Sequence, residues 1–403
     1  MNVVVTSFGS QGDFNPLLAI ASALVRRGVA VTFVANPFYE SRVKSTGSRF
    51  VGAGNYLDVF AALEANPRYF SKRAGAVAVW KELIVPSIRA IYPIVRDTVY
   101  EVGATSVVSH FASYGGAWAA AETGVRSVIV TTSPSAWLSR HQPVVFANWR
   151  APRIVQGALT TAIRAISWAV LRQALRRLAA EIGAPMVDTM RVAELNLGVW
   201  PEWFRPPASD DPQRSRICGF VFDNVDASEP LPPNVESFLA AGDSPIVASF
   251  GSAASLHATD RYLAVASACG KLGRRCLLIG PSADAVAPSP NTMVVASAPY
   301  ARVFPAASVV IHHGGFGTCG EALRAGKPSL VTPFAFDQFD TAARVQDLGL
   351  GRWLTGDANN DALMAGALDS TLLDASLAAA AHDAAVKIAA APDGADRAAE
   401  LIG

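Results

Sequence analysis

The sequence predicts an α/β protein made of two doubly wound, parallel-sheet domains. Short apolar runs alternate with amphipathic segments through the first 200 residues, and a second series of the same kind begins near residue 246. Such alternation is typical of βα repeats, which build parallel sheets covered by helices on both faces. Residues 200–235, between the two series, are rich in proline, aspartate and serine, which indicates a loop and interdomain linker.

The first series opens with a strand at 3–7 and a helix from about Pro16 to Arg27. Apolar residues recur on one face of that helix, and Gly28 closes it. Further strands are expected at 29–35, 106–109 and 128–132. The second series supplies strands at 246–250, 276–279, 293–296, 309–311 and 329–332. The alanine-rich tail from 372 to 401 is predicted to be helical, with a break near 392–394.

Bulk properties exclude several classes of protein. With 34 basic and 33 acidic residues among 403, the net charge is +1, so no global field would attract nucleic acid. The four cysteines share no metal-ligand spacing and form no CxxC pair. The chain opens on a strand without a signal peptide and has no uninterrupted run of 18 apolar residues. We therefore expect a cytoplasmic protein with reduced thiols and no membrane span.

Residues 151–182 interleave five arginines with apolar residues at helical spacing. One interpretation is one or two helices packed on the core with the arginines in solvent. The other is a helix that lines an acceptor channel or lies on a membrane surface. A peripheral membrane contact through this segment therefore stays open.

The most informative segment is 309–338, VVIHHGGFGTCGEALRAGKPSLVTPFAFDQ. An apolar strand ends in two histidines, and a turn with Gly314, Gly315 and Gly317 leads into a helix. Glycines let a ligand approach the backbone closely, and a helix start offers free N–H groups and the positive end of the helix dipole. The turn therefore predicts a binding site for a diphosphate. Glu321 can accept hydrogen bonds from ribose hydroxyls. Asp337 and Gln338, after the next strand, offer acceptors and donors to a sugar, and the segment thus predicts a nucleotide-sugar donor.

The loop between the first strand and the first helix is the second candidate site. Residues 9–13 read Gly-Ser-Gln-Gly-Asp, without the lysine of a P-loop or a full GxGxxG. In a structural role, Gly12 would turn the chain and Asp13 would lie near the helix N-cap. In a functional role, the loop would contact a ligand, because ligands bind at the carboxyl ends of parallel strands.

These segments resemble the family 1 glycosyltransferases, and the resemblance extends over most of the chain. Residues 309–338 resemble their donor-binding signature, 9–43 the acceptor side of their bacterial branch, and 231–255 the start of their donor domain. The sequence PFAFDQFDTAARV (333–345) is most similar to rhamnosyltransferase-like and natural-product members. The resemblance implies the GT-B architecture, in which two doubly wound domains face each other across a cleft.

We accordingly expect an acceptor-binding domain at 1–215, a linker at 216–235 and a nucleotide-sugar-binding domain at 236–384. The resemblance also implies that the C-terminal helix, about 385–403, packs back onto the first domain.

The resemblance implies specific residue roles. Asp13 would be the general base, with Ser10 and Gly12 in a loop near donor and acceptor. The residues expected to bind the donor are Ser252, Ala298, His313, Gly314, Gly315, Gly317, Thr318, Glu321, Asp337 and Gln338. His313 would contact the diphosphate and His312 would be structural. Relatives often stack an aromatic residue on the nucleobase where this chain has Ser297, and whether Ser297 or Tyr300 contacts the base stays open.

These roles imply an inverting, metal-independent glycosyltransferase. It would transfer a hexose or deoxyhexose to a hydroxyl of a hydrophobic natural product or lipid. No Asp-x-Asp pair is present to hold a metal, and no cofactor is expected besides the UDP- or TDP-sugar co-substrate. An aspartate of ordinary pKa, about 3.9, is a weak base, so burial must raise its pKa or the proton must transfer late.

The alternatives are a nucleotide-sugar epimerase or hydrolase of the same fold and a catalytically silent, nucleotide-sugar-binding helper protein. His110, Phe111, Ser133 and Pro134 end two strands of the first series and are candidate acceptor contacts, although a structural histidine is equally compatible with position 110. Trp80, Trp118 and Trp137 either fill the core or line an apolar acceptor pocket. Sugar, base, acceptor and oligomeric state stay open.

Overall fold

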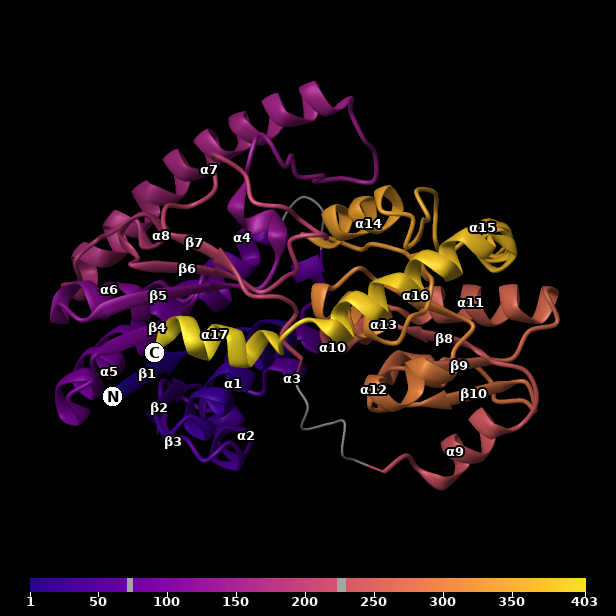
Figure 1. The fold of residues 1–403 in the computed structure, drawn as a ribbon, viewed down its shortest axis with the longest axis horizontal. Helices are drawn as coiled ribbons and strands as arrows, with labels where there is room; N and C mark the ends of the chain where they lie inside the picture. The colour runs from indigo at the N-terminus through magenta and orange to yellow at the C-terminus, as the bar shows by residue number, and fades with distance from the viewer. Residues whose placement is uncertain (71–74, 223–229) are drawn as a thin grey trace.

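The computed structural model describes residues 1–70, 75–222 and 230–403. Within them, two parallel sheets lie side by side, each with helices on both faces (Figure 1). The predicted fold class, two doubly wound parallel sheets, is confirmed.

The first sheet has the strand order β3-β2-β1-β4-β5-β6-β7, and every neighbouring pair is parallel. Its strands are β1 (Asn2–Thr6), β2 (Ala30–Ala35), β3 (Arg49–Gly52), β4 (Ser106–His110), β5 (Arg126–Thr131), β6 (Leu195–Gly198) and β7 (Ser215–Ile217). The chain runs outward from β1 in one direction and then restarts at β4 on the other side. The boundary between β1 and β4 is therefore a topological switch point, where ligands bind in open α/β sheets.

The second sheet repeats this plan with the order β10-β9-β8-β11-β12-β13. Its strands are β8 (Ile246–Ser249), β9 (Cys276–Ile279), β10 (Thr292–Val295), β11 (Val309–His312), β12 (Ser329–Val331) and β13 (Gly351–Trp353). The switch point here lies between β8 and β11. The strands β3, β6, β7 and β13 were not predicted, because each has only three or four residues and most carry polar or glycine positions that hide any periodicity.

Helices surround both sheets. In the first half these are α1 (Gln11–Arg26), η1 (Pro37–Tyr39), α2 (Glu40–Ser45), α3 (Val59–Ala65), η2 (Pro67–Phe70), α4 (Gly75–Val79), the π-turn η3 (Trp80–Ile84), α5 (Val85–Val102), α6 (Tyr114–Thr123), η4 (Pro134–Trp137), α7 (Arg153–Ile182) and α8 (Thr189–Val192). In the second half they are α9 (Pro233–Ala240), α10 (Gly251–Ala254), η6 (Ser255–His257), α11 (Thr259–Lys271), η7 (Pro281–Ala285), α12 (Tyr300–Val303), η8 (Phe304–Ala306), α13 (Phe316–Arg324), α14 (Gln338–Asp347), α15 (Asp361–Leu373), α16 (Ala375–Ala390) and α17 (Gly394–Ile402).

The first helix, α1, begins five residues earlier than predicted, at Gln11. Ser10 is its N-cap, and the Ser10 backbone N–H and hydroxyl donate to Asp13 Oδ2 at 3.1 and 3.2 Å. The Asp13 carboxylate thus satisfies the Ser10 backbone N–H, as in a capping box, and this fixes the helix start ahead of Pro16. Gly12 therefore lies in the first helical turn and not in a loop, which corrects the prediction for that residue.

The chain returns to its first half at the C-terminus. Helix α16 lies against α13 in the second half, and α17 then packs on α1 beside the N-terminal strand (Figure 1). Ala395, Ala398 and Ile402 are buried in the same apolar cluster as Leu17 and Leu24. The crossing segment thus starts after Ala390, later than the predicted 385. The predicted linker also overlaps β7 at its start and α9 at its end.

Candidate functional site

The two switch points place one cluster of polar groups on each sheet. The β1–β4 switch point carries Asp13, on the first turn of α1, and His110, the last residue of β4. The β8–β11 switch point carries Gly251 and Ser252, directly after β8, and His313 with the glycine-rich turn after β11. All of these groups lie at carboxyl ends of parallel strands, as the ligand-binding rule for such sheets requires.

Asp13 combines accessibility with a desolvated setting. Its side chain is 37% exposed, and the two hydrogen bonds from Ser10 reach only Oδ2. Burial among surrounding protein atoms raises the pKa of Asp13 to about 6, although the hydrogen bonds from Ser10 oppose this rise. The carboxylate is thus a stronger base than an ordinary aspartate, and Oδ1 stays open to a ligand.

His110, which the sequence offered as an acceptor contact or a structural histidine, is a neighbour of Asp13. Its Nε2 lies 3.6 Å from Asp13 Oδ1 and 3.1 Å from Thr132 Oγ1. Its Nδ1 accepts a hydrogen bond from the Ala112 N–H at 3.3 Å, so the neutral ring carries its proton on Nε2. Burial lowers the pKa of His110 to about 3, so the ring is neutral near pH 7. The Nε2–H therefore donates to Thr132 Oγ1, and the neutral ring lies beside the Asp13 carboxylate without adding a charge.

The His313 ring is held between two glycines. A Cβ atom at Gly251 would lie 2.6 Å from His313 Cε1, and one at Gly315 would lie 2.3 Å from His313 Nε2. Gly251 also has a φ of +71°, which favours glycine. Burial, together with the nearby Arg261 cation, lowers the pKa of His313 to about 4, so the ring is neutral. Its buried Nδ1 has no hydrogen-bond partner within the described residues.

The turn after His313 leads directly into a helix. Helix α13 begins at Phe316 with Gly315 as its N-cap, so no side chain caps its first amides. A Cβ at Gly317 would meet no atom within 4 Å, whereas one at Gly314 would lie 2.7 Å from the Gln338 carbonyl oxygen. Thr318, buried on the first turn, adds a hydroxyl at this helix start. This is an arrangement that can bind an anion through amides and dipole.

His312 has a different environment from His313. It is fully buried, and its Nδ1 accepts a hydrogen bond from the Gly314 N–H at 3.1 Å. Burial lowers the pKa of His312 to about 3, so it also stays neutral. The hydrogen bond fixes the glycine-rich turn from behind, which is a structural task.

Gln338 differs from the expectation that it offers both acceptor and donor to a sugar. Its Oε1 accepts hydrogen bonds from the N–H groups of Phe334 and Ala335, at 2.8 and 3.0 Å, and its side chain is buried. The carbonyl oxygen therefore shapes the loop 333–337, and only the NH₂ group can serve a ligand. Asp337 is therefore the residue that can accept hydrogen bonds from a sugar at this position.

Asp337 connects the two halves of the molecule. Burial raises the pKa of Asp337 to about 6, a hydrogen bond from the Ser133 side chain opposes the rise, and the charge of Asp13 adds to it. Ser133 follows β5 of the first sheet. Nearby, the Val145 N–H donates to Asp340 Oδ1 at 3.1 Å, and Arg150 pairs with Asp347 at 2.5 Å. The carboxyl edges of the two sheets therefore face each other, with Asp13 and Asp337 close enough to interact.

The other predicted donor residues lie around the second switch point. Glu321, on α13, pairs with Arg324 at 2.6 Å, and the Arg324 guanidinium lies 4.2 Å from the centre of the Phe222 ring. Ala298 is half-buried, and the neighbouring Ser297 is exposed. Tyr300 shares a 2.6 Å hydrogen bond with Ser249 and stacks on Phe304. One face of its ring is thus covered by its own domain.

Arg261 is a further residue near this site that sequence reasoning missed. It lies buried on α11, where its Nη1 donates to the Thr332 carbonyl at 2.6 Å and its guanidinium covers the Phe334 ring at 3.9 Å. Both contacts hold the start of the loop that carries Asp337. No local pattern could reveal it, because a single arginine on an amphipathic helix is ordinarily a surface residue.

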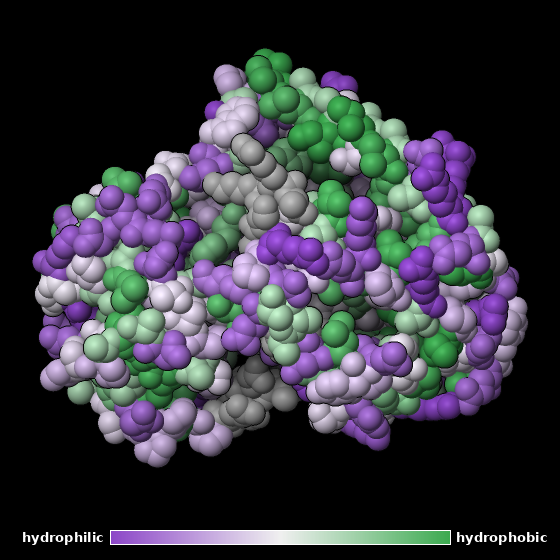
Figure 2. Space-filling model, turned by 180° about the vertical axis from the view of Figure 1, so that it is seen from behind, coloured by the Kyte–Doolittle hydropathy of each residue, from purple (hydrophilic) through white to green (hydrophobic). Residues whose placement is uncertain are grey.

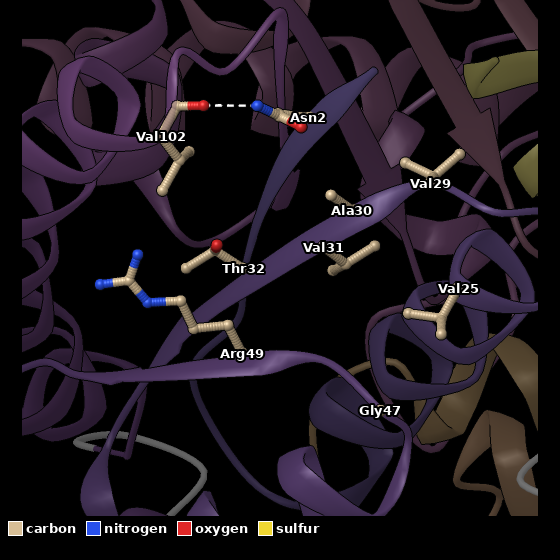
Figure 3. Close-up of a pocket in the computed structure, with 9 residues that line it drawn as sticks. All are labelled: Asn2, Val25, Val29, Ala30, Val31, Thr32, Gly47, Arg49 and Val102. Carbon is tan, nitrogen blue, oxygen red and sulfur yellow. Dashed lines mark hydrogen bonds between the residues drawn. The ribbon is translucent and has the colours of Figure 1, made fainter.

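Two cavities were considered as alternative sites. A hollow of about 360 Å³ lies at the amino ends of the strands of the first sheet, beside Asn2, Ala30 and Arg49 (Figure 3). Arg49 there is paired with Glu101. Since ligands bind at carboxyl ends, this hollow is not a candidate active site. The second, of about 510 Å³, lies beside Arg261, Phe334 and Asn148, next to the loop of Asp337.

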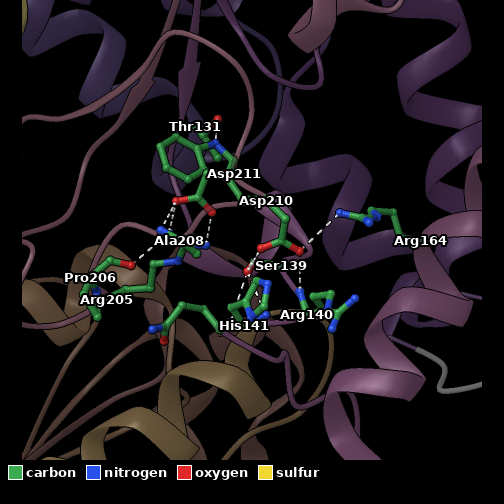
Figure 4. Close-up of polar contacts among 12 residues, drawn as sticks. Thr131, Ser139, Arg140, His141, Arg164, Arg205, Pro206, Ala208, Asp210 and Asp211 are labelled. Atoms are coloured by element: carbon green, nitrogen blue, oxygen red, sulfur yellow. Dashed lines mark hydrogen bonds and ion pairs between the residues drawn. The ribbon is translucent and has the colours of Figure 1, made fainter. Parts of the chain in front are cut away.

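Two of the three tryptophans that could have lined an acceptor pocket belong to the core. Trp118 is fully buried and Trp137 is 3% exposed, whereas Trp80 is half-buried. The guanidinium of Arg205 lies 5.2 Å from the Trp137 ring and forms a buried ion pair with Asp211 (Figure 4). Next to it, Asp210 binds Ser139 and the Arg140 N–H and lies 3.6 Å from Arg164 of α7. These pairs fix the segment between η4 and α7.

Within the described ranges, no three His, Cys, Asp or Glu side chains come together in a way that would hold a metal ion. The predicted catalytic and donor-binding residues instead form two groups, one on each sheet. Asp13 and Ser10 belong to the first, and His313, the Gly314–Thr318 turn, Ser252 and Asp337 to the second.

Comparison with known proteins shows similarity to glycosyltransferases. Residues 281–403 match the family described as "Erythromycin biosynthesis protein CIII-like, C-terminal domain". An uncharacterized glycosyltransferase of Mycobacterium tuberculosis is 27% identical over 375 residues, covering 87% of this chain and 86% of the relative.

Two solved structures share the fold over the full length of the chain. The glycotransferase of kitacinnamycin has a TM-score of 0.77 at 21% identity, covering 100% of this chain and 98% of that one. The spinosyn rhamnosyltransferase complexed with thymidine diphosphate has a TM-score of 0.70 at 20% identity, covering 100% of both chains. The chain therefore shares the fold of these two glycosyltransferases over its full length, and it is similar in sequence to glycosyltransferases over most of its length.

Proposed function

We propose that this glycosyltransferase moves a hexose or deoxyhexose from a nucleoside-diphosphate sugar to a hydroxyl of a hydrophobic small molecule, with inversion and without a metal ion. The observation that carries the proposal is the pairing of the two switch points. A carboxylate with a raised pKa on one sheet faces an anion-binding helix start and a sugar-sized polar loop on the other.

Asp13 is the general base in this mechanism. Its open Oδ1 takes the proton of the acceptor hydroxyl while the hydroxyl oxygen attacks the anomeric carbon from the face opposite the diphosphate. The bond from the anomeric carbon to the diphosphate oxygen breaks, and the electron pair leaves with the diphosphate. A pKa of about 6 makes the carboxylate available near neutral pH and basic enough to assist late proton transfer. The neutral His110 ring, with its Nε2 3.6 Å from Oδ1, packs beside the carboxylate.

The departing diphosphate is stabilised by neutral donors. The uncapped amides at the start of α13, the Thr318 hydroxyl and the neutral His313 ring converge where the glycine-rich turn admits a ligand. Each such donor typically contributes a factor on the order of 10²–10³ to turnover. This set supports catalysis without a divalent ion. Glu321 would hold the ribose, and Asp337 with the Gln338 NH₂ group would hold the sugar.

The donor is a uridine or thymidine diphosphate sugar. Thymidine is favoured because a solved structure of the same fold, the spinosyn rhamnosyltransferase, holds thymidine diphosphate. Position 297 holds an exposed serine, which has no aromatic ring to stack on the base. Tyr300 stacks on Phe304, so only one face of its ring is uncovered. The acceptor is a small natural product or lipid alcohol. A cytoplasmic location suits the four cysteines, all of which are buried and free.

Differential scanning fluorimetry with uridine and thymidine diphosphates and their sugars tests the donor assignment, because ligand binding raises the melting temperature. A panel of hydrophobic alcohols, with nucleoside diphosphate release as readout, tests transfer. We expect a shift with at least one diphosphate and acceptor-dependent release. Binding without release against every alcohol would instead favour the silent helper, and release of an epimerised donor would favour the epimerase.

A further inference from the structure

Helix α7 (Arg153–Ile182) exposes an apolar face along the upper edge of the first half of the molecule (Figures 1 and 2). Ile154, Ile166 and Val170 are 89%, 64% and 67% exposed. At about 100° per residue, these side chains share one side of the helix with Ala158, Ala162, Ala165 and Ala169, all of which are exposed. The window of highest hydropathy in α7 is only 17% buried, which is unlike a core helix.

The same face becomes basic toward the C-terminal end of the helix. Arg172 and Arg176 lie within about 40° of the direction of Ile154 around the helix axis, Arg177 lies between the directions of Ile166 and Val170, and all three arginines are exposed. None of them forms an ion pair with any residue in the described parts of the chain. The only acidic residue of α7 is Glu181, and it is paired with Arg89. The face therefore combines unpaired positive charge with apolar surface and has no acidic residue of its own.

The helix is anchored at both ends, so this face is fixed in place. Near its start, Thr160 Oγ1 accepts a hydrogen bond from the Val144 N–H at 3.1 Å, and Arg164 lies 3.6 Å from Asp210 (Figure 4). Near its end, Leu175 and Leu178 are buried against α5 and α6. Although α7 has the length and hydropathy of a membrane-spanning helix, it cannot cross a bilayer while these contacts hold it on the domain. It can only lie on a surface.

We propose that α7 docks the enzyme on an anionic lipid membrane, parallel to the surface. A helix in the interface buries its apolar side chains at the level of the headgroups, and arginines beside them attract anionic lipids. The charge argues for lipid over a second copy of the chain, because two copies of this face would bring six arginines together. The proposal goes beyond sugar transfer and does not depend on the identity of the donor.

Flotation with large unilamellar vesicles tests this proposal on the full-length chain. Vesicles of phosphatidylcholine with about 30% phosphatidylglycerol should carry the protein at low salt, and pure phosphatidylcholine vesicles should carry roughly tenfold less. Two variants separate the contributions: Ile166→Ser with Val170→Ser, and Arg172→Gln with Arg176→Gln and Arg177→Gln. Each should lower binding by roughly tenfold or more.

Matched controls lie on other surfaces. Leu373→Ser with Val386→Ser removes exposed apolar side chains from the second half, and Arg27→Gln with Arg274→Gln removes exposed charges. These variants should float like the native chain. All variants should keep the native thermal shift with thymidine diphosphate or uridine diphosphate, whichever the native chain binds, so that loss of vesicle binding is separated from loss of the nucleotide site.

Three outcomes would overturn the proposal. The first is a native chain that does not float with anionic vesicles, and the second is one that floats equally well with neutral vesicles. The third is a dimer, seen by sedimentation velocity, that the Ile166→Ser and Val170→Ser variant dissociates, which would assign the face to a second copy. Absence of transferase activity in a chain that still binds vesicles would refute the proposed function and leave membrane docking intact.

Discussion

The two switch points differ in the groups that build them. Between β8 and β11 the proposed donor side consists of backbone amides, glycines and a neutral histidine, most of them within one continuous segment. Between β1 and β4 the acceptor side consists of side chains from separate segments, Asp13 and His110, which are 97 residues apart in the sequence and 3.6 Å apart in space. The donor side is suited to hold and stabilise an anion, and the acceptor side to move a proton. Each difference leads to a separate prediction.

The largest effect is expected from Asp13→Asn. Asparagine keeps the shape and most of the capping hydrogen bonds but cannot take the acceptor's proton, so turnover should fall by roughly 10²–10⁴-fold. Nucleoside diphosphate affinity, measured by calorimetry, should hardly change because Asp13 belongs to the other sheet. Near-native turnover in a variant with a normal melting temperature would assign Asp13 to helix capping alone.

His313→Ala tests the donor side. Loss of a neutral donor to the developing diphosphate charge should lower kcat by on the order of 10²-fold, with a smaller effect on donor affinity. Thr318→Ala should act in the same direction. Steady-state kinetics at saturating donor would measure this, and an unchanged kcat for His313→Ala would remove His313 from the leaving-group site.

Glu321→Ala should act on binding and not on chemistry. The ribose hydroxyls do not change during transfer, so nucleoside diphosphate affinity should fall by about tenfold while kcat at saturating donor stays near native. Arg324→Ala, which removes the partner of Glu321 without removing the acceptor, is a matched control. Unaltered affinity in Glu321→Ala would contradict the ribose assignment.

The smallest effect is expected from His110→Ala, which removes the buried neutral ring whose Nε2 lies 3.6 Å from Asp13 Oδ1. Without that ring water reaches the carboxylate, and burial is what raises its pKa, so the pKa should fall by less than about one unit and kcat should fall by less than about tenfold. The readout that distinguishes this from a structural defect is the acid limb of the pH profile, which should move to lower pH. A profile that keeps its midpoint would show that His110 only packs.

The sequence predicted the donor side better than the acceptor side, and the reason is physical. Strand, glycine-rich turn and helix are local, so 309–331 was predicted to within a few residues. The contact between Ser10 and Asp13 is also local, and the sequence placed Asp13 near the helix N-cap, but the helix start was predicted too late, at Pro16. The approach of His110 to Asp13, the hydrogen bond from Ser133 to Asp337 and the position of Arg261 depend on the packing of separate segments, which no local pattern encodes.

The catalytic claim is tested most directly by the pH dependence of kcat in the native enzyme and in Asp13→Asn. With the pKa of Asp13 raised to about 6, the base is protonated below that pH, so the native rate should fall about tenfold per pH unit below about 6. Melting must be followed at each pH. The folded chain keeps His110, His312 and His313 neutral, while the unfolded chain protonates them below about pH 6.5. These histidines therefore lower the free energy of unfolding as the pH falls below about 6.5. Asp13→Asn should show a low rate without this acid limb. The same limb in both proteins, measured while both stay folded, would contradict the assignment of Asp13 as the base.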